Sequence, residues 1–370
     1  MSPTLLENGD QTQRLEFTPS VSSDILFSIH GLTLFVLIFH IAFRCVLKLR
    51  FKKSNHSHRD DVIDFILMVF SCTFSVVSLS ILIFVQLLQV VNEQNLLQFR
   101  FALGGVCMLI PGTIVIIYER KLEHKDAANS SFKTSLQERG KQFLQTLKIL
   151  ILDKMTYFGI LTILLLQILV PFISIIFIPG VKFSMSSSFL RNYLSQFLTL
   201  NADEENLKKI HTLLNDLENS QFLTFYILIL SGSLLSMGLN GFFGYGEEKC
   251  WREFLWNYYW RNHSKESEQQ KSGSLMKFIQ SSLWIGFIHG VWHAPMILLG
   301  HNYGMKEHVG SQWKGVLMMT ASCTFLSPLL CFFTEYSQLS LSSYDNVEKN
   351  SNPKANGILA GILHGIFNSS

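Results

Sequence analysis

Long apolar runs dominate this chain and limit what it can fold into. Runs of about 18 or more residues, each long enough to cross roughly 30 Å of hydrocarbon, cover residues 25–47, 62–91, 101–118, 156–179, 222–246, 278–299 and 315–335. A further run starts at Ala355 and ends with the chain at Ser370. Because unpaired backbone groups are costly in lipid, each run is predicted to be helical. The sequence therefore predicts an all-α, polytopic transmembrane bundle of about eight helices.

Composition and charge support a multi-pass integral membrane protein, in a plasma membrane or endoplasmic reticulum. Only 15% of the residues are charged, against about 25% in soluble proteins. Lys and Arg number 21 on one side of the predicted spans (48–61, 119–154, 247–277 and 336–354) and eight on the other. Basic loops face the cytosol, so the N-terminus is predicted outside or in a lumen. Lipid is the expected surrounding partner, and nucleic acid is not expected.

The chain divides into three segments by the position of its polar residues. Residues 1–155 hold a polar tail, three spans and a basic cytosolic loop, and residues 156–221 hold a fourth span and an outer loop. Residues 222–370 place polar side chains inside the spans, where they are expensive and usually functional. The six cysteines show no spacing typical of a disulfide framework or a zinc knuckle.

An acidic pair lies in the sequence GYGEEKCWREF. Glu248 and Arg252 are neighbours on a helix, four residues apart, and can pair. Glu247 then points to another face and has no obvious partner, which suits a general base. A break is expected at the preceding glycines, because 222–260 as one helix would be nearly 60 Å long. A charge cluster at the membrane surface is the alternative interpretation.

Two further pairs with helical spacing follow in the sequence. His289 and His293 share one face of a helix, and Pro295 predicts a kink just after them. His364 and Asn368 lie on the last apolar run, among small residues that permit close helix contact. Hydrogen bonding between helices would explain either pair without any chemistry.

Depth in the membrane is predicted to bring the three groups together. Glu247 lies 14 residues before Arg261, about 21 Å along a helix. His293 lies 16 residues after Lys277, or about 24 Å, and His364 lies about 15 Å above Lys354 on the same measure. A Glu and a His that face one water form a hydrolytic pair, and a second His with an amide could stabilise an oxyanion.

In these residues the chain resembles the CPBP intramembrane proteases, which include CAAX prenyl endopeptidases and bacteriocin-processing or self-immunity (Abi-like) proteins. The family motifs Glu-Glu-x-x-x-Arg, Phe-x-x-x-His and His-x-x-x-Asn correspond, in order, to Glu247-Glu248…Arg252, His289…His293 and His364…Asn368. The surrounding sequence is similar to the bacterial-type subgroup, and the resemblance covers roughly residues 222–370.

The resemblance implies a membrane-embedded peptidase that needs no cofactor. Glu247 with His293 would activate water, His364 with Asn368 would line the oxyanion site, and Glu248 and Arg252 would support them. The substrate would be a peptide or protein near the membrane, in a cavity open to the cytosol.

Two departures from the family keep other interpretations open. His289 stands where the family has Phe, which is either a tolerated swap or an extra polar group. The last run holds only about 16 residues, short for a crossing, and predicts a truncated chain or a re-entrant helix. The alternatives are a metal-dependent membrane protease with His289, His293, His364 and a Glu as ligands, and a non-catalytic scaffold or immunity protein.

Overall fold

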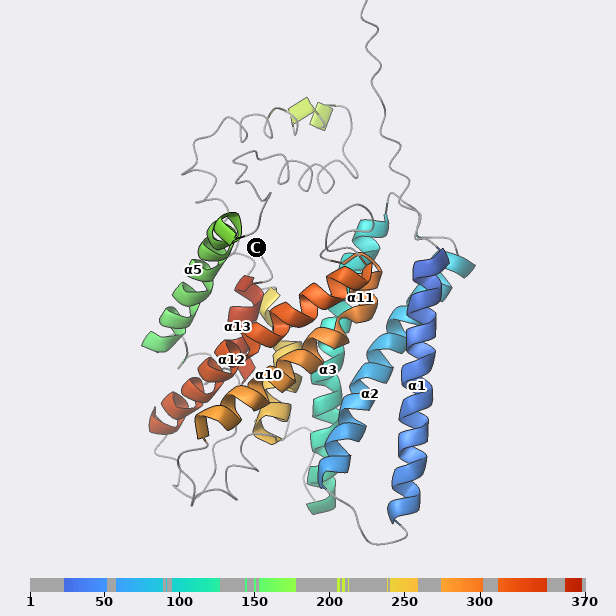
Figure 1. The fold of residues 1–370 in the computed structure, drawn as a ribbon, viewed down its shortest axis with the longest axis horizontal. Helices are drawn as coiled ribbons and strands as arrows, with labels where there is room; N and C mark the ends of the chain where they lie inside the picture. Colours follow the sequence, from blue (N-terminus) through green and yellow to red (C-terminus); the bar gives the residue numbers. More distant parts are fainter. Residues whose placement is uncertain are drawn as a thin grey trace, which may run out of the picture.

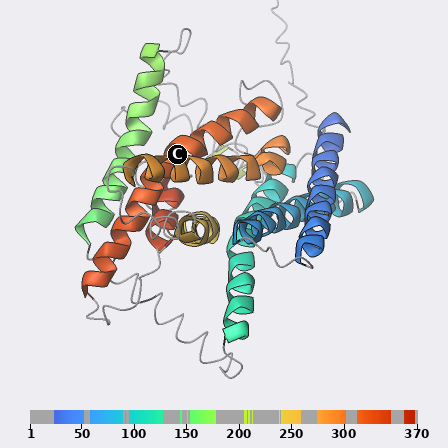
Figure 2. The same cartoon turned by 60° about the horizontal axis from the view of Figure 1, so that its bottom comes forward.

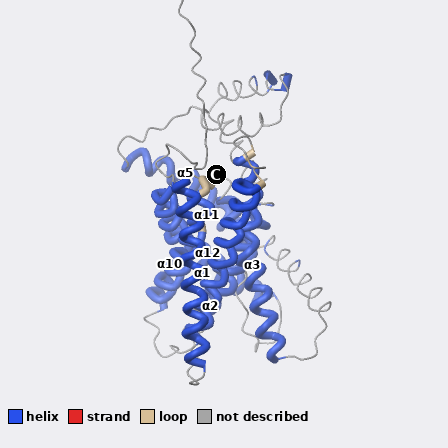
Figure 3. Tube along the Cα trace, turned by 90° about the vertical axis from the view of Figure 1, so that its right-hand side faces the viewer, coloured by secondary structure: helices blue, strands red, loops and turns tan. Residues whose placement is uncertain are grey.

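The structure is a computed structural model, and its described residues are helical apart from short turns, with no strand among them (Figure 3). The described residues are 23–51, 58–88, 91, 95–126, 144, 150, 153–177, 205, 206, 208, 209, 212, 238, 240–258, 274–301, 312–344 and 357–367. The all-α prediction is confirmed for this part of the chain.

Three helices form the N-terminal part of the bundle. They are α1 (Ser23–Phe51), α2 (His58–Ser80), which continues as the π-helical segment η1 (Ile81–Leu87), and α3 (Leu96–Asp126). α1 packs along α2, and α2 along α3, at the right of Figure 1. A polar ladder joins α1 to α2: Arg44 donates two hydrogen bonds to Asp64 (2.9 and 3.0 Å), and His40 contacts Asp64 and Ser71.

The remaining helices form the C-terminal part. They are α5 (Lys154–Phe177), the helical residues 240–248 with the π-helical η2 (Lys249–Leu255), α10 (Ser274–Trp292), α11 (Ala294–Leu298), α12 (Gln312–Tyr344) and α13 (Gly357–Phe367). α10 runs along α12 (Figure 1). The 240–258 helix appears almost end-on in Figure 2. Its η2 segment contacts α3, α10, α12 and α13. It is therefore the central element of this half.

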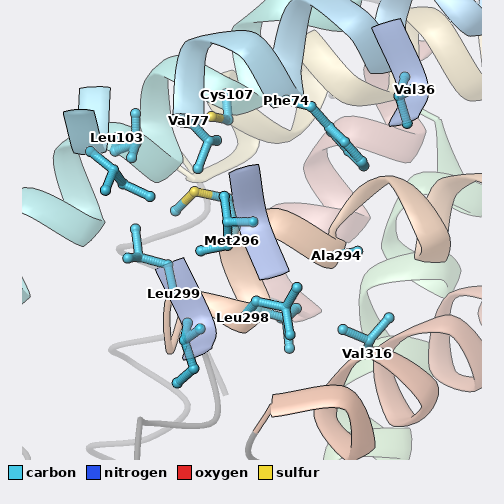
Figure 4. Packing of buried hydrophobic residues seen from close by; sticks show 14 residues of the cluster. Val36, Phe74, Val77, Leu103, Cys107, Ala294, Met296, Leu298, Leu299 and Val316 are labelled. Atoms are coloured by element: carbon cyan, nitrogen blue, oxygen red, sulfur yellow. The ribbon is translucent and has the colours of Figure 1, made fainter. Parts of the chain in front are cut away.

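Buried apolar clusters hold the two halves together. One cluster joins α1, α2 and α3 to α11, with Phe74, Leu103, Met296 and Leu298 among its members (Figure 4). A second packs Trp251 and its neighbours in η2 against α2, α3 and α10, and a third joins α5, α12 and α13. The first two clusters contain residues from N-terminal and C-terminal helices, whereas the third contains residues from C-terminal helices.

The outer face of the helices is apolar. On α1, Phe27 is 80% exposed and Phe35 66% exposed, and large apolar side chains on α3, α5 and α12 are exposed as well. In contrast, charged and polar side chains are buried in the interior. An apolar surface of this extent suits lipid rather than water.

Four helices within the described residues are long and apolar enough to cross a membrane: Asp24–Leu47, Asp61–Leu87, Gln98–Glu119 and Gln312–Ser337. The predicted count of about eight is not confirmed. The 278–299 run is divided at His293, near the kink that Pro295 predicted, and α13 comprises 11 described residues. Most of the 222–246 run, the cytosolic loop and the outer loop lie outside the described residues.

Candidate active site

The acidic pair lies on the central helix, at the last regular turn before η2. Both Glu247 and Glu248 have no exposed surface. They are not a surface charge cluster, because apolar residues and neighbouring helices surround them. No break occurs over 240–258; instead the helix changes to π-helical geometry at Lys249. π-helical turns inside α-helices are frequent at functional sites.

Glycines bring the backbones of two other helices, α3 and α13, close to this helix. A Cβ on Gly246 would lie 2.6 Å from the Met108 carbonyl oxygen of α3, and one on Gly365 would lie 2.4 Å from the Gly241 nitrogen. A Cβ on Gly361 would lie 2.8 Å from the Tyr245 Cα. The glycines expected to bend the helix therefore serve close packing instead. This close packing places His364 of α13 next to the acidic pair.

Glu248 and Arg252 form the predicted pair, fully buried. Nη1 of Arg252 donates to Oε1 of Glu248 at 3.0 Å. The same Glu248 oxygen lies 2.7 Å from Nδ1 of His364. An ionised carboxylate only accepts hydrogen bonds, so Nδ1 of His364 is the donor. Glu248 thus fixes the orientation of the His364 ring, and Nε2 of that ring faces Glu247.

His289 bridges Arg252 and Glu247. Its Nδ1 lies 2.9 Å from Nη1 of Arg252, and its Nε2 lies 2.6 Å from Oε2 of Glu247. A guanidinium has donors only, so Nδ1 of His289 accepts and Nε2 carries the proton. His289 therefore donates to Glu247 and supplies the partner that the spacing did not reveal. Trp251 packs against the same ring in a tilted arrangement, with centroids 5.2 Å apart.

Two more histidines face the Glu247 carboxylate. Oε2 of Glu247 lies 3.7 Å from Nε2 of His293 and 4.0 Å from Nε2 of His364. The other oxygen, Oε1, is buried and has no hydrogen-bond partner in the structure. In the site, His289 therefore orients Oε2 of Glu247, and the imidazoles of His293 and His364 face the same oxygen.

His293 owes its position to the end of α10. The helix stops at Trp292, and His293 forms the turn before α11, whose second residue is Pro295. Its carbonyl oxygen accepts hydrogen bonds from the Met296 and Ile297 nitrogens at 3.1 and 3.0 Å. The proline therefore ends one helix and starts the next, and His293 lies at the junction.

Cys323 of α12 is a member of the site that sequence reasoning missed. One ligand atom from each of His289, His293 and Cys323 lies within 4.8 Å of the others. The cysteine was recognisable only as one of several scattered thiols inside the spans, because nothing in the spacing shows which face of α10 meets α12. His364, a member of the expected metal set, is not part of this group of three, although its Nε2 lies 4.0 Å from Oε2 of Glu247.

Of the site residues predicted from the sequence, Asn368 lies outside the described residues. The others, namely Glu247, Glu248, Arg252, His289, His293 and His364, lie in one buried cluster.

In comparison with known proteins, the chain matches no family model, no curated protein and no solved structure.

Proposed function

We propose that this chain is a glutamate-type intramembrane endopeptidase of the CPBP kind. The single observation behind the proposal is the Glu247 carboxylate: it is fully buried, one oxygen is oriented by His289, and the other has no partner. A carboxylate arranged in this way is prepared to accept a proton from a bound water. The three motifs of the resemblance meet at this group, except for Asn368, which is not described.

The proposed reaction begins with a water between Glu247 and His293. Oε1 of Glu247 takes one water proton as the water oxygen attacks the carbonyl carbon of the peptide. His293 orients the water from the other side, at the junction of α10 and α11. The carbonyl oxygen becomes an oxyanion in the tetrahedral intermediate. The proton then passes from Glu247 to the amide nitrogen, the C–N bond breaks, and a carboxylic acid and an amine are released.

His364 would stabilise the oxyanion, which requires that both nitrogens of its ring carry a proton. Its Nδ1–H is committed to Glu248, so Nε2 can donate to the oxyanion only when the ring carries both protons. The two carboxylates beside it favour this imidazolium electrostatically. Asn368 would add its side-chain amide, as the resemblance implies. Glu248 and Arg252 would act by holding His364 and His289 in place.

The experiment compares the wild type with Glu247→Gln at equal expression in the native host. New peptide termini are measured by quantitative mass spectrometry. We expect termini that depend on the wild type, and a loss of at least about a hundredfold in the variant, since general bases contribute roughly that much or more. Glu205→Gln is the matched control, because its side chain is 81% exposed and pairs with Lys209 far along the chain from the site.

Unchanged termini in Glu247→Gln, with both proteins stably inserted, would refute this mechanism and favour the scaffold or immunity function. The substrate class would follow from the wild-type termini themselves. Prenylated tails, peptide precursors and loops of membrane proteins would each leave a recognisable set of cleavage sites.

A further inference from the structure

Cys323 faces His289 of α10 and His293 at the junction with α11 because α10 and α12 meet at backbone contact. A Cβ on Gly286 would lie 2.5 Å from the Cys323 carbonyl oxygen, and a Cβ on Gly290 would lie 2.4 Å from the Thr320 Cα. These two glycines flank His289 on its own helix. The thiol is buried, and its contact within the structure is the weak one with the Met319 sulfur at 3.7 Å.

The three side chains have the chemistry of a zinc ligand set. Two imidazoles and one thiolate are typical ligands of Zn²⁺, which takes a fourth ligand in tetrahedral geometry. Oε2 of Glu247 is suited to that position, at 2.6 Å from Nε2 of His289 and 3.7 Å from Nε2 of His293. Ligand atoms around zinc are separated by about 3.3–3.7 Å, so the three side chains within 4.8 Å would close slightly on an ion, while Oε2 of Glu247 and Nε2 of His289 would move apart from 2.6 Å.

The charges of the site also favour a divalent cation. When His364 is neutral, without the second proton that the proposed catalysis requires, the two carboxylates and one guanidinium leave one negative charge uncompensated. A bound Zn²⁺ adds two positive charges, and the thiolate that it requires adds one negative charge. The sum is then zero, which removes the cost of an unbalanced buried charge.

We propose that His289, His293 and Cys323 form a binding site for Zn²⁺ or a similar thiolate-seeking cation, and that the bound ion switches the site off. On binding, the thiol releases its proton to solvent, and His289 moves its ring proton from Nε2 to Nδ1. Glu247 becomes the fourth ligand, so it no longer accepts a proton from water. The coordination is closed, whereas catalytic zinc sites keep one position open for water.

The tautomer change explains why the ion would act as a switch and not as a permanent part of the protein. Nδ1 of His289 accepts a hydrogen bond from Arg252 in the metal-free arrangement. Once Nδ1 carries the proton, that bond is lost and Arg252 must turn toward Glu248 alone. Metal binding and the arrangement proposed for catalysis therefore exclude each other. The inhibition rests on the proposed function, but the binding does not.

The binding test uses the purified full chain and Co²⁺, whose bond to a thiolate gives a charge-transfer band in the near ultraviolet. We expect the band to saturate at one Co²⁺ per chain and to disappear when Zn²⁺ displaces it. Cys323→Ser should abolish the band. Cys331→Ser is the matched control, because Cys331 is another buried thiol of α12 that contacts Ser327 instead. A wild type without the band, or a band that survives in Cys323→Ser, would overturn the proposal.

The inhibition test measures cleavage with and without added Zn²⁺, as a ratio for each variant. We expect Zn²⁺ to inhibit the wild type and Cys331→Ser equally. Sensitivity to Zn²⁺ should fall by more than about tenfold in Cys323→Ser, the loss typical of even an outer-shell contact. If chelators abolish wild-type cleavage, the ion is catalytic and the switch is refuted. If the band forms but no variant cleaves, the metal site stands and the proposed peptidase fails.

Discussion

At the scale of single residues, Arg252 determines the protonation of the site. It has donors only, and its Nη1 contacts both Glu248 and His289. His289 must therefore present its proton to Glu247. His289, which differs from the Phe of the motif that the sequence resembles, thus contacts two charged residues of the site. The sequence left two interpretations of His289 open, a tolerated swap or an extra polar group. The contacts with Arg252 and Glu247 agree with the extra polar group.

The first prediction at this scale concerns His289 as a positioning residue. His289→Phe removes the hydrogen bond to Glu247 and leaves Arg252 with one acceptor fewer. A hydrogen bond to a charged group contributes about 1.5–3 kcal/mol, so kcat should fall about tenfold to a hundredfold, with KM little changed. The measurement is the steady-state cleavage of a substrate identified from the wild-type termini.

His289→Gln separates positioning from simple packing. Its amide can accept from Arg252 and donate to Glu247, as the imidazole does, so it should restore part of kcat. Equal losses in His289→Phe and His289→Gln, or wild-type kinetics in His289→Phe, would show that the contact with Glu247 does not orient the carboxylate for reaction.

At the scale of elements, α13 depends on small residues. The helix has only 11 residues, yet it delivers His364 to the acidic pair through backbone contact with the 240–248 helix. Its first turn is also anchored, since the Gly357 nitrogen donates to Oε2 of Glu253 at 3.2 Å. A carboxylate at a helix N-terminus is favourable. The position of His364 therefore depends on packing at both ends of a short helix.

Gly365→Ala should displace this helix. The added Cβ would lie 2.4 Å from the Gly241 nitrogen, a backbone atom that cannot move away cheaply. Overpacking of this kind costs about 1–3 kcal/mol, and the shift of His364 should lower cleavage as well. Thermal unfolding in detergent measures the first effect. The control is Gly31→Ala on α1, where a Cβ would have no atom within 4 Å. Equal stability of the two variants would contradict the packing argument.

The elements also show how far sequence reasoning could reach. Helical spacing and depth sufficed to group Glu247, His293 and His364, because both are fixed by the geometry of a helix in a membrane. Cys323 and the π-helical turn at Lys249 could not be predicted, because they depend on which helix faces meet. Hydropathy predicts about eight spans, but it does not register the division at His293.

At the scale of the whole molecule, the structure changes the charge count that set the orientation. Arg252 was counted among the basic residues of the cytosolic side, yet it is fully buried in the site. Without Arg252, and without the buried Arg100 on the other side, the split is 20 against seven, so the asymmetry remains. The N-terminus is still predicted outside or in a lumen, and the basic segments in the cytosol.

This orientation can be tested by labelling single cysteines with a membrane-impermeant maleimide. The background carries Ser at Cys45 and Cys72, the two exposed native thiols. We expect His56→Cys and His263→Cys to react only after the membrane is permeabilised, because both lie in basic segments. Gln94→Cys lies between two spans on the opposite side, so it should react in intact cells. The reverse pattern would place the basic segments outside and would remove the cytosolic access that the proposed peptidase requires.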